Sequence, residues 1–311
     1  MRPLSTQRAC ELDPQAAQPH WLIEGLWTDQ AVGVVGGEPK SFKSFLALDL
    51  AVTVAADALC LNRYRTHQPG PVLLFAGEDA LHMVRQRIEG IARARGVAFD
   101  GLDVHVVTEA TLRIDLEDQR QRLRECARRL RPRLLILDPF VRTHRIDENA
   151  VADVAPLLAF LRQLQREFHM AVVLVHHARK ARHARPGQAL RGSSEIHAWV
   201  DSALYLRRKD DQVHVTIEHR AAPAPAPFAL TLDTRDQAVA LCLVNPAEEP
   251  NPDTLTPGDR LLQALGDSPQ PMTQRALRQV ARMRAATVGS LLADLIGQGR
   301  VRQVPEGYRL A

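Results

Sequence analysis

The side chains best suited to chemistry in this chain lie in a short polar segment between two apolar runs. Lys43 and Ser44 end the sequence Gly-Gly-Glu-Pro-Lys-Ser-Phe-Lys-Ser, and the apolar runs are residues 31–35 and 45–52. This order predicts a strand, a tight loop and a helix, so that loop amides and free helical N–H groups point at an anion. Lys43 would then reach the β- and γ-phosphates of a nucleotide, and the Ser44 hydroxyl would hold Mg²⁺.

The segment departs from the phosphate-loop pattern G-x-x-x-x-G-K-[ST] at one position. Gly37 matches the first glycine, but Phe42 stands where the second glycine allows a turn without a Cβ penalty. An ordinary loop with two lysines is the alternative. Two of the four lysines in the chain fall here, which favours a phosphate-binding loop. The residues expected to contact a nucleotide are Gly37, Glu38, Pro39, Lys40, Ser41, Phe42, Lys43, Ser44 and Phe45.

The composition excludes several classes of protein. The 311 residues suit one large domain and a small one, and a hydrophobic content of 45% is enough for ordinary cores. No apolar run approaches the ~18 residues that span a membrane, and residues 1–20 show no signal-peptide core. Without such a run, no membrane partner is expected. The scattered cysteines, without a C-x-x-C pair, indicate reduced thiols in a cytoplasmic protein and no cysteine metal site; they are Cys10, Cys60, Cys126 and Cys242.

The net charge of +4 is concentrated near the C-terminus. Residues 255–311 contain eight arginines, no lysine and four acids, whereas the preceding 254 residues contain 32 basic and 32 acidic residues. A basic segment is expected where a protein meets phosphate backbones, and solvated surface charge is the alternative.

Alternating apolar runs and helical stretches predict the fold class. Continuous apolar runs are typical of strands buried on both faces of a parallel sheet, and the β-α-β alternation indicates an open α/β sheet with right-handed crossovers. Strands are expected at residues 31–35, 72–75, 104–107, 133–139 and 171–177, and the helices after residue 44 and at 81–95, 118–130 and 150–168.

The remaining segments predict how the chain divides into domains. Residues 203–207, 213–218, 228–232 and 239–244 are expected to form antiparallel strands that close the edge of the sheet. Residues 1–245 would then be one domain, with residues 1–20 irregular. Four prolines and three acids between Asn245 and Pro257 predict a linker at residues 246–257.

Residues 258–311 predict a second, smaller domain. Three helices followed by a hairpin around Glu306-Gly307 are typical of a winged helix-turn-helix, with residues 285–298 as its recognition helix. Such domains bind either DNA or protein, and the pattern leaves both open.

Acidic and imidazole side chains follow the predicted parallel strands, at the edge where open α/β sheets place their sites. Asp138 is the Walker B candidate and would hold Mg²⁺ through a water. Glu78 is the candidate base for the attacking water. Each acid could instead cap the next helix, but a phosphate loop in the same sheet favours the catalytic roles. His177 could sense the γ-phosphate, whereas His176 is expected to pack or hydrogen-bond within the sheet.

A basic loop follows the strand at residues 171–177. Its cations are Arg179, Lys180, Arg182 and Arg185. This loop is either a solvated surface segment or, in a ring of subunits, the lining of a central hole that grips a nucleic-acid backbone.

Arg191 precedes Gly-Ser-Ser and a predicted helix. It could act as an arginine finger on the γ-phosphate of a neighbouring subunit. Such fingers accelerate hydrolysis by about 10³–10⁵ in other nucleotide hydrolases.

Five motifs together resemble the RepA-type plasmid helicases, which are RecA-like ATPases. They are GEPKSFKS at residues 37–44, AGED at 76–79, LILD at 135–138, VHHARK at 175–180 and RGSS at 191–194, and Asp147-Glu148-Asn149 also matches the family pattern. The resemblance covers residues 20–245. It implies a RecA-like P-loop core with a mostly parallel sheet, a hexameric ring, and ATP with Mg²⁺ at subunit interfaces.

The resemblance also implies roles for single residues. Glu78 would be the base, Asp138 the metal-side acid, His177 the sensor and Arg191 the finger acting on the next subunit. Phe42 looks like a loop variant found in this wider group.

The leading hypothesis is therefore an ATP-hydrolysing ring motor on single-stranded DNA, acting as a replicative helicase of a plasmid or mobile element with replication proteins as partners. One alternative is a RecA-like loader or recombination accessory. Another is a regulator whose winged helix binds a duplex site while ATP acts as a switch; the complete set of hydrolytic residues argues against it.

Overall fold

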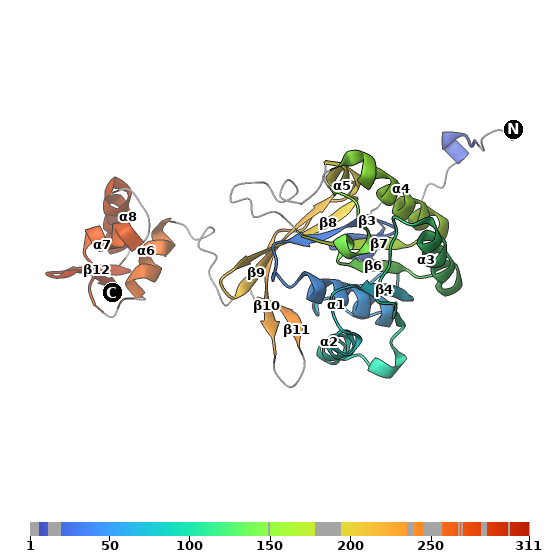
Figure 1. Cartoon of the computed structure of the whole chain (residues 1–311). Coiled ribbons are helices and arrows are strands. Elements are labelled where there is room, and N and C mark those ends of the chain that lie inside the picture. The colour runs from blue at the N-terminus through green and yellow to red at the C-terminus, as the bar shows by residue number, and fades with distance from the viewer. Residues whose placement is uncertain are drawn as a thin grey trace. The chain divides into compact units, whose positions relative to one another are not determined.

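The computed structural model divides the chain into two compact units, Met1–Val244 and Asn245–Ala311 (Figure 1). It describes residues 6–11, 20–148, 150–177, 194–234, 239–244, 257–266, 268, 270–280, 285–297 and 299–310. None of the helices in these ranges is long and apolar enough to cross a membrane.

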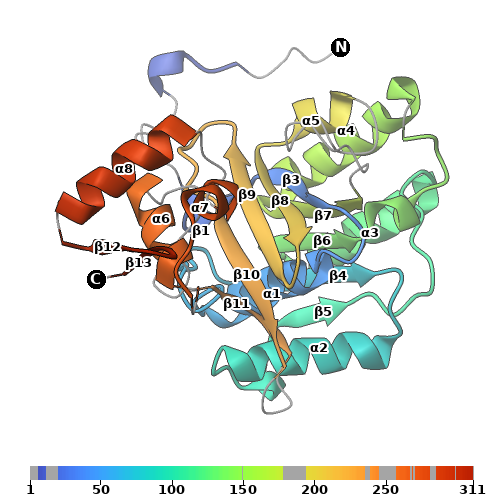
Figure 2. The same ribbon diagram turned by 90° about the vertical axis from the view of Figure 1, so that its left-hand side faces the viewer.

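A single large sheet, nine-stranded within the described ranges, is the centre of the first unit, in the order β11-β10-β9-β8-β3-β7-β6-β4-β5 (Figure 2). The strands from β8 to β5 run parallel, which confirms the predicted mostly parallel α/β sheet. They are β3 (Val32–Gly37), β4 (Val72–Ala76), β5 (Val104–Val106), β6 (Leu134–Asp138), β7 (Ala171–His177) and β8 (Ser202–Lys209).

The strands at the other edge are antiparallel to their neighbours. They are β9 (Gln212–His219), β10 (Phe228–Asp233) and β11 (Ala240–Leu243). The expectation that β8 belongs to an antiparallel group was wrong on one side, because β8 pairs in parallel with β3. The chain between β7 and β8 includes helix α5 (Ser194–Trp199). It returns to the end of the sheet where the parallel strands begin, as a parallel crossover requires.

Helices cover both faces of the sheet and create two cores. One core packs α1 and α2 against alternate residues of the strands, such as Leu74 and Ile136. The other packs α3, α4 and α5 against the intervening residues, such as Leu73 and Leu135. This alternation explains why the strands read as continuous apolar runs. The helices are α1 (Lys43–Ala56), α2 (Leu81–Ala94), α3 (Glu117–Leu130) and α4 (Val151–Phe168), with short 3-10 turns at Ala9–Glu11, Phe99–Gly101 and Phe140–Thr143.

Two glycines let β3 approach β8 closely. A Cβ on Gly33 would lie 1.7 Å from the carbonyl oxygen of Ser202, and a Cβ on Gly37 would lie 2.3 Å from that of Leu206. A hairpin of β1 (Trp21–Ile23) and β2 (Trp27–Thr28) packs beneath this contact. The Trp27 ring is fully buried, and a Cβ on Gly33 would also meet it at 3.1 Å.

A buried ion pair fixes the helix that follows the phosphate-loop segment. The side chains of Asp49 in α1 and Arg95 after α2 are 0% and 1% exposed and form an ion pair. Arg95 also donates to the carbonyl oxygen of Leu241 in β11 at 2.7 Å, and the Leu61 amide donates to Asp49 at 3.3 Å. The pair therefore joins α1, α2 and the antiparallel edge of the sheet.

The second unit contains three helices and a hairpin within its described residues. Its core consists of Leu261, Leu277, Val288, Leu292, Leu295, Val301 and their neighbours. Helix α6 begins at Pro257, so the predicted linker of residues 246–257 extends one residue too far, and the rest of it lies outside the described residues. A winged helix-turn-helix fold stays a prediction. The elements are α6 (Pro257–Gly266), α7 (Gln274–Val280), α8 (Ala285–Gly297), β12 (Val301–Val304) and β13 (Gly307–Leu310).

Removing one partner of the buried pair should be more damaging than removing both. Asp49→Ala leaves the Arg95 guanidinium buried without its carboxylate, so we expect the free energy of unfolding to fall by about 3–5 kcal/mol. Asp49→Leu combined with Arg95→Met should cost less than either single change. Urea unfolding followed by circular dichroism measures Asp49→Ala, the singles Asp49→Leu and Arg95→Met, and the double variant. A double variant as unstable as the sum of its two singles would contradict the prediction.

Candidate nucleotide-binding site

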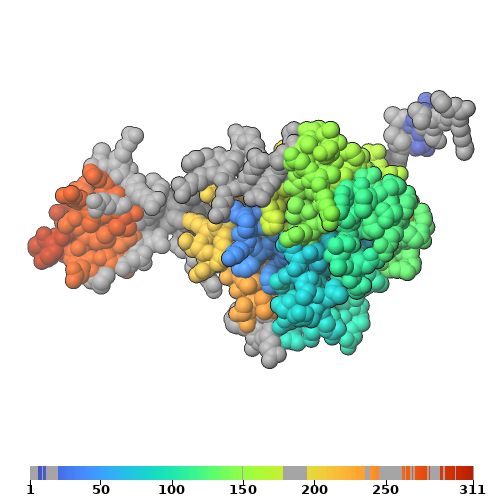
Figure 3. All heavy atoms as spheres, viewed as in Figure 1, coloured from blue at the N-terminus to red at the C-terminus, as the bar shows by residue number. Residues whose placement is uncertain are grey.

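The strand, loop and helix that begin the site are present as residues 32–56. Strand β3 ends at Gly37 and α1 begins at Lys43. Between them Pro39 and Lys40 are exposed, so the loop faces solvent. In the space-filling view, the blue segment that contains β3 and α1 reaches the surface between the cyan and yellow segments (Figure 3). The N-terminus of α1 therefore opens to the outside, as an anion site requires.

Phe42 takes the place of the missing glycine by adopting a left-handed conformation. Its φ is 61° and it is the N-cap of α1. The ring packs edge-on against Phe45 with 6.2 Å between centroids, and the Arg208 guanidinium lies 5.4 Å from the ring centroid. The sequence could indicate the strained turn, but not that β8 would supply an arginine to hold the ring.

Lys43 is a buried cation at the start of α1. Its side chain donates to the carbonyl oxygen of Glu38 at 2.7 Å, and the residue is 5% exposed. Burial lowers the pKa of Lys43 to about 8, while Asp138, Glu78 and Glu38 act in the opposite direction. The Ser41 hydroxyl also donates to the Glu38 carbonyl oxygen, at 2.7 Å. The ammonium is thus held within the loop and mostly charged at neutral pH.

Asp138 ends β6 beside Ser44. Burial raises the pKa of Asp138 to about 6; the Ser44 hydroxyl and Lys43 lower it, and the nearby Asp79 and Glu78 raise it further. The structure therefore brings together the lysine, the hydroxyl and the acids that the sequence singled out.

This donor set fits Mg²⁺ held partly by phosphate and water. Ser44 and Asp138 offer one hydroxyl and one carboxylate, the hard oxygen ligands that Mg²⁺ uses at nucleotide sites. Throughout the described residues, no group of three or more His, Cys, Asp or Glu side chains forms a closed metal cage.

Glu78 follows β4 and lies near the same edge. Its carboxylate is 3.1 Å from Nε of Arg142, and the two side chains are 46% and 59% exposed. Asp79 pairs with Arg87 of α2. Sequence analysis missed Arg142 and Arg87, because an arginine has no pattern of its own among the many in this chain.

The end of β7 places two histidines beside the loop strand. His177 is half-buried and aligned with Gly37, and His176 is buried and aligned with Gly36. His176 packs within the sheet, as expected.

A partly buried carboxylate joins His176 to the chain after β6. Glu148 lies 3.3 Å from Nε2 of His176 and 3.3 Å from Nε2 of His144. Burial would raise the pKa of Glu148, but the two imidazoles outweigh this effect and lower it to about 2. Phe140 packs against both rings. The Asp147-Glu148-Asn149 motif pointed to this carboxylate, but neither histidine could be assigned to it from sequence.

The remaining predicted site residues lie outside the described residues. They are Arg179, Lys180, Arg182, Arg185 and Arg191.

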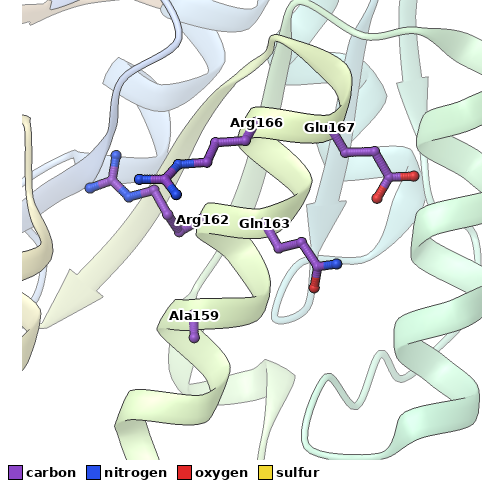
Figure 4. A pocket seen from close by; sticks show the side chains of 5 residues that line it. All are labelled: Ala159, Arg162, Gln163, Arg166 and Glu167. Carbon is purple, nitrogen blue, oxygen red and sulfur yellow. The ribbon is translucent and has the colours of Figure 1, made fainter. Parts of the chain in front are cut away.

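A hollow on the surface of α4 is a different feature. It is lined by Ala159, Arg162, Gln163, Arg166 and Glu167, with the two arginines pointing to one side and Gln163 and Glu167 to the other (Figure 4). Arg162 donates to the carbonyl oxygen of Trp199 at 2.7 Å and pairs with Asp201, and Arg124 donates to Glu167 at 3.2 Å. These contacts hold α4 against α5, the residue before β8, and α3.

A mostly parallel sheet with a lysine-bearing loop after a central strand fits a RecA-like P-loop ATPase core. The chain belongs to the AAA domain family, which matches residues 2–183. The RadB recombinase is similar in structure, with 14% sequence identity over 68% of this chain and 90% of that chain and a TM-score of 0.51. A second solved structure, that of an ATPase domain, matches with 14% identity over 68% and 85% of the two chains and a TM-score of 0.50. At this identity the similarity concerns the fold.

The two shifted pKa values predict a bell-shaped pH profile for nucleotide binding. Affinity should rise as pH increases through about 6, because Asp138 becomes a carboxylate, and fall above about 8, because Lys43 loses its proton. Titration of a fluorescent ATP analogue between pH 5 and 9.5 measures both limbs. In Lys43→Arg the guanidinium stays charged, so persistence of the alkaline limb in that variant would contradict the assignment.

The left-handed turn at Phe42 predicts that glycine is tolerated better than alanine at this position. Both Phe42→Ala and Phe42→Gly lose the ring contacts, but alanine keeps the strain of a positive φ. We expect the glycine variant to be more stable than the alanine variant by about 1 kcal/mol in urea unfolding. An alanine variant of equal or greater stability would show that the turn is relaxed without glycine.

Proposed function

We propose that this chain is an ATP-hydrolysing motor that acts on DNA as a ring, hexameric by its resemblance, and that it serves as a replicative helicase of a plasmid or mobile element. The observation that carries the proposal is the buried Lys43 beside the Ser44–Asp138 pair, with Glu78 at the same sheet edge. Membership of the AAA domain family and the similarity to an ATPase domain and a recombinase support it.

Each group has a role in the proposed reaction. Below its pKa of about 8 the Lys43 ammonium is charged, so phosphate oxygens can replace the Glu38 carbonyl as its partner. Ser44 and Asp138 would hold Mg²⁺, which neutralises charge on the phosphate oxygens. Glu78, 46% exposed, is open to water and is the proposed base for the attacking water.

The ring and its grip on DNA rest on the resemblance. In the proposal Arg191 reaches the nucleotide of the neighbouring subunit, and His177 senses the γ-phosphate. The basic residues between 179 and 185 would contact single-stranded DNA in the central hole. Replication proteins are the proposed partners, and the cytoplasm is the proposed location.

The similarity to the RadB recombinase favours one alternative function for the same ATPase domain. The chain could use ATP to assemble on DNA as a loader or recombination accessory. Forked DNA separates the two: a helicase displaces a strand in proportion to ATP hydrolysis, whereas a loader hydrolyses ATP under DNA stimulation without displacement.

Two substitutions test nucleotide binding and ATP hydrolysis. Lys43→Ala should abolish nucleotide binding and hydrolysis, whereas Glu78→Gln should keep nucleotide binding and lower kcat by about 10²–10⁴. Glu89→Gln, an equally exposed acid on α2 that pairs with Arg93, is the matched control and should leave kcat unchanged. ATP turnover is measured with and without single-stranded DNA. A Glu78→Gln variant of normal kcat, or a wild-type chain indifferent to DNA, would refute the proposal.

A further inference from the structure

The hairpin of the second unit places arginines on one face. In its register Arg302 lies directly opposite Arg309, and Gln303 lies opposite Tyr308. Val301 is buried in the core and Tyr308 packs against it, so the face with Arg302 and Arg309 points away from the core. Arg300 immediately precedes β12. All three arginines are exposed.

The register that opposes these arginines is firmly set. Gly307 has a φ of 146°, and a Cβ there would lie 2.4 Å from the carbonyl oxygen of Met272. Met272 and Tyr308 exchange two backbone hydrogen bonds of 2.9 Å. A slip of one residue would turn the arginines into the core.

Directly opposed like charges destabilise a strand pair. Among the described residues, no acid forms an ion pair with Arg300, Arg302 or Arg309. An anionic partner would remove the repulsion, and a face with positive charge and no internal counter-charge is the arrangement that phosphate backbones select.

Helix α8 lacks the long side chains that make bidentate hydrogen bonds to base edges; its polar residues are Thr287, Ser290 and Asp294. Its sequence, Ala-Ala-Thr-Val-Gly-Ser-Leu-Leu-Ala-Asp-Leu-Ile-Gly, contains no Arg, Lys, Asn or Gln, and Gln298 comes only after its last residue. These four residue types make the common hydrogen bonds to base edges in the major groove. The role expected of residues 285–298 as a recognition helix therefore lacks these bidentate contacts, whereas three arginines lie on the hairpin or next to it.

The form of DNA follows from the lack of a stacking surface. Proteins that bind single strands stack bases on aromatic side chains. Tyr308 is the sole aromatic residue in the sequence of residues 255–311, and its ring packs against the core. A duplex, whose bases are already stacked and whose phosphates are closely spaced, suits a face made of arginines.

We propose that the β12–β13 hairpin binds the phosphate backbone of duplex DNA through Arg300, Arg302 and Arg309, without reading its sequence. The inference rests on the proposed function, in which the chain works on DNA. It adds a second site, which tethers the ATPase to the duplex that adjoins its single strand.

The test uses the full chain and two labelled 20-base-pair duplexes of unrelated sequence. Fluorescence anisotropy at several salt concentrations gives the slope of log affinity against log salt. Arg302→Gln combined with Arg309→Gln should reduce this slope by about 2 for both duplexes, since each lost phosphate contact removes about 0.9. The lysine pair Arg302→Lys and Arg309→Lys keeps the charges and should retain most of the slope.

The matched control removes two charges elsewhere. Arg122→Gln combined with Arg128→Gln alters two similarly exposed arginines on α3 and should leave the slope unchanged. An unchanged slope in the hairpin glutamine pair, equal losses in the α3 pair, or no duplex binding by the wild type would overturn the inference. So would a loss confined to a single-stranded probe, or strong wild-type preference for one duplex.

Failure of the proposed function is separately visible. If the wild type binds duplex DNA through the hairpin but DNA does not stimulate its ATPase activity, the proposal of duplex binding by the hairpin is retained and the proposed function fails. If DNA stimulates the ATPase but the Arg302→Gln and Arg309→Gln double variant binds duplex DNA normally, the proposed function is retained and the proposal of duplex binding by the hairpin fails.

Discussion

The buried, positively charged side chain of Lys43, where the parallel strands end, is the constraint on which the first unit depends. Burial alone would favour a neutral Lys43, and three acids together with the Glu38 carbonyl oppose that tendency. Burial also raises the pKa of Asp138, and the nearby Asp79 and Glu78 raise it further. Such opposed shifts mark a place where charge is held ready for an incoming charged group.

The packing around this edge keeps those charges in place. Glycines let β3 lie against β8, and the Phe42 ring meets Arg208 of that same strand. The Asp49–Arg95 pair holds α1 from its far side. The helix that begins at Lys43 is thus fixed at its N-terminus, beside the site, and at its middle, within the core, which suits a site that must be pre-formed.

Sequence patterns predicted what depends on local order and missed what depends on long-range contact. The phosphate loop and Asp138 were recognisable because apolar runs announce strands, and because the ends of parallel strands meet at one edge. The direction of β8 was not predictable, since the composition of a strand does not reveal whether it runs parallel or antiparallel to its neighbour. Glu148 stood out in its motif, yet its partners His144 and His176 come from separate segments. The absence of Arg and Lys from α8 was readable from sequence, but its significance needed the hairpin register beside it.

The buried Trp27 has a practical consequence for experiments. All three tryptophans, Trp21, Trp27 and Trp199, belong to the first unit, and the second contains none. Intrinsic indole emission therefore follows the melting of the ATPase core alone, while peptide-bond absorption changes follow both units. A difference between the two transition midpoints would measure how independently the two units fold, without cutting the chain or adding a label.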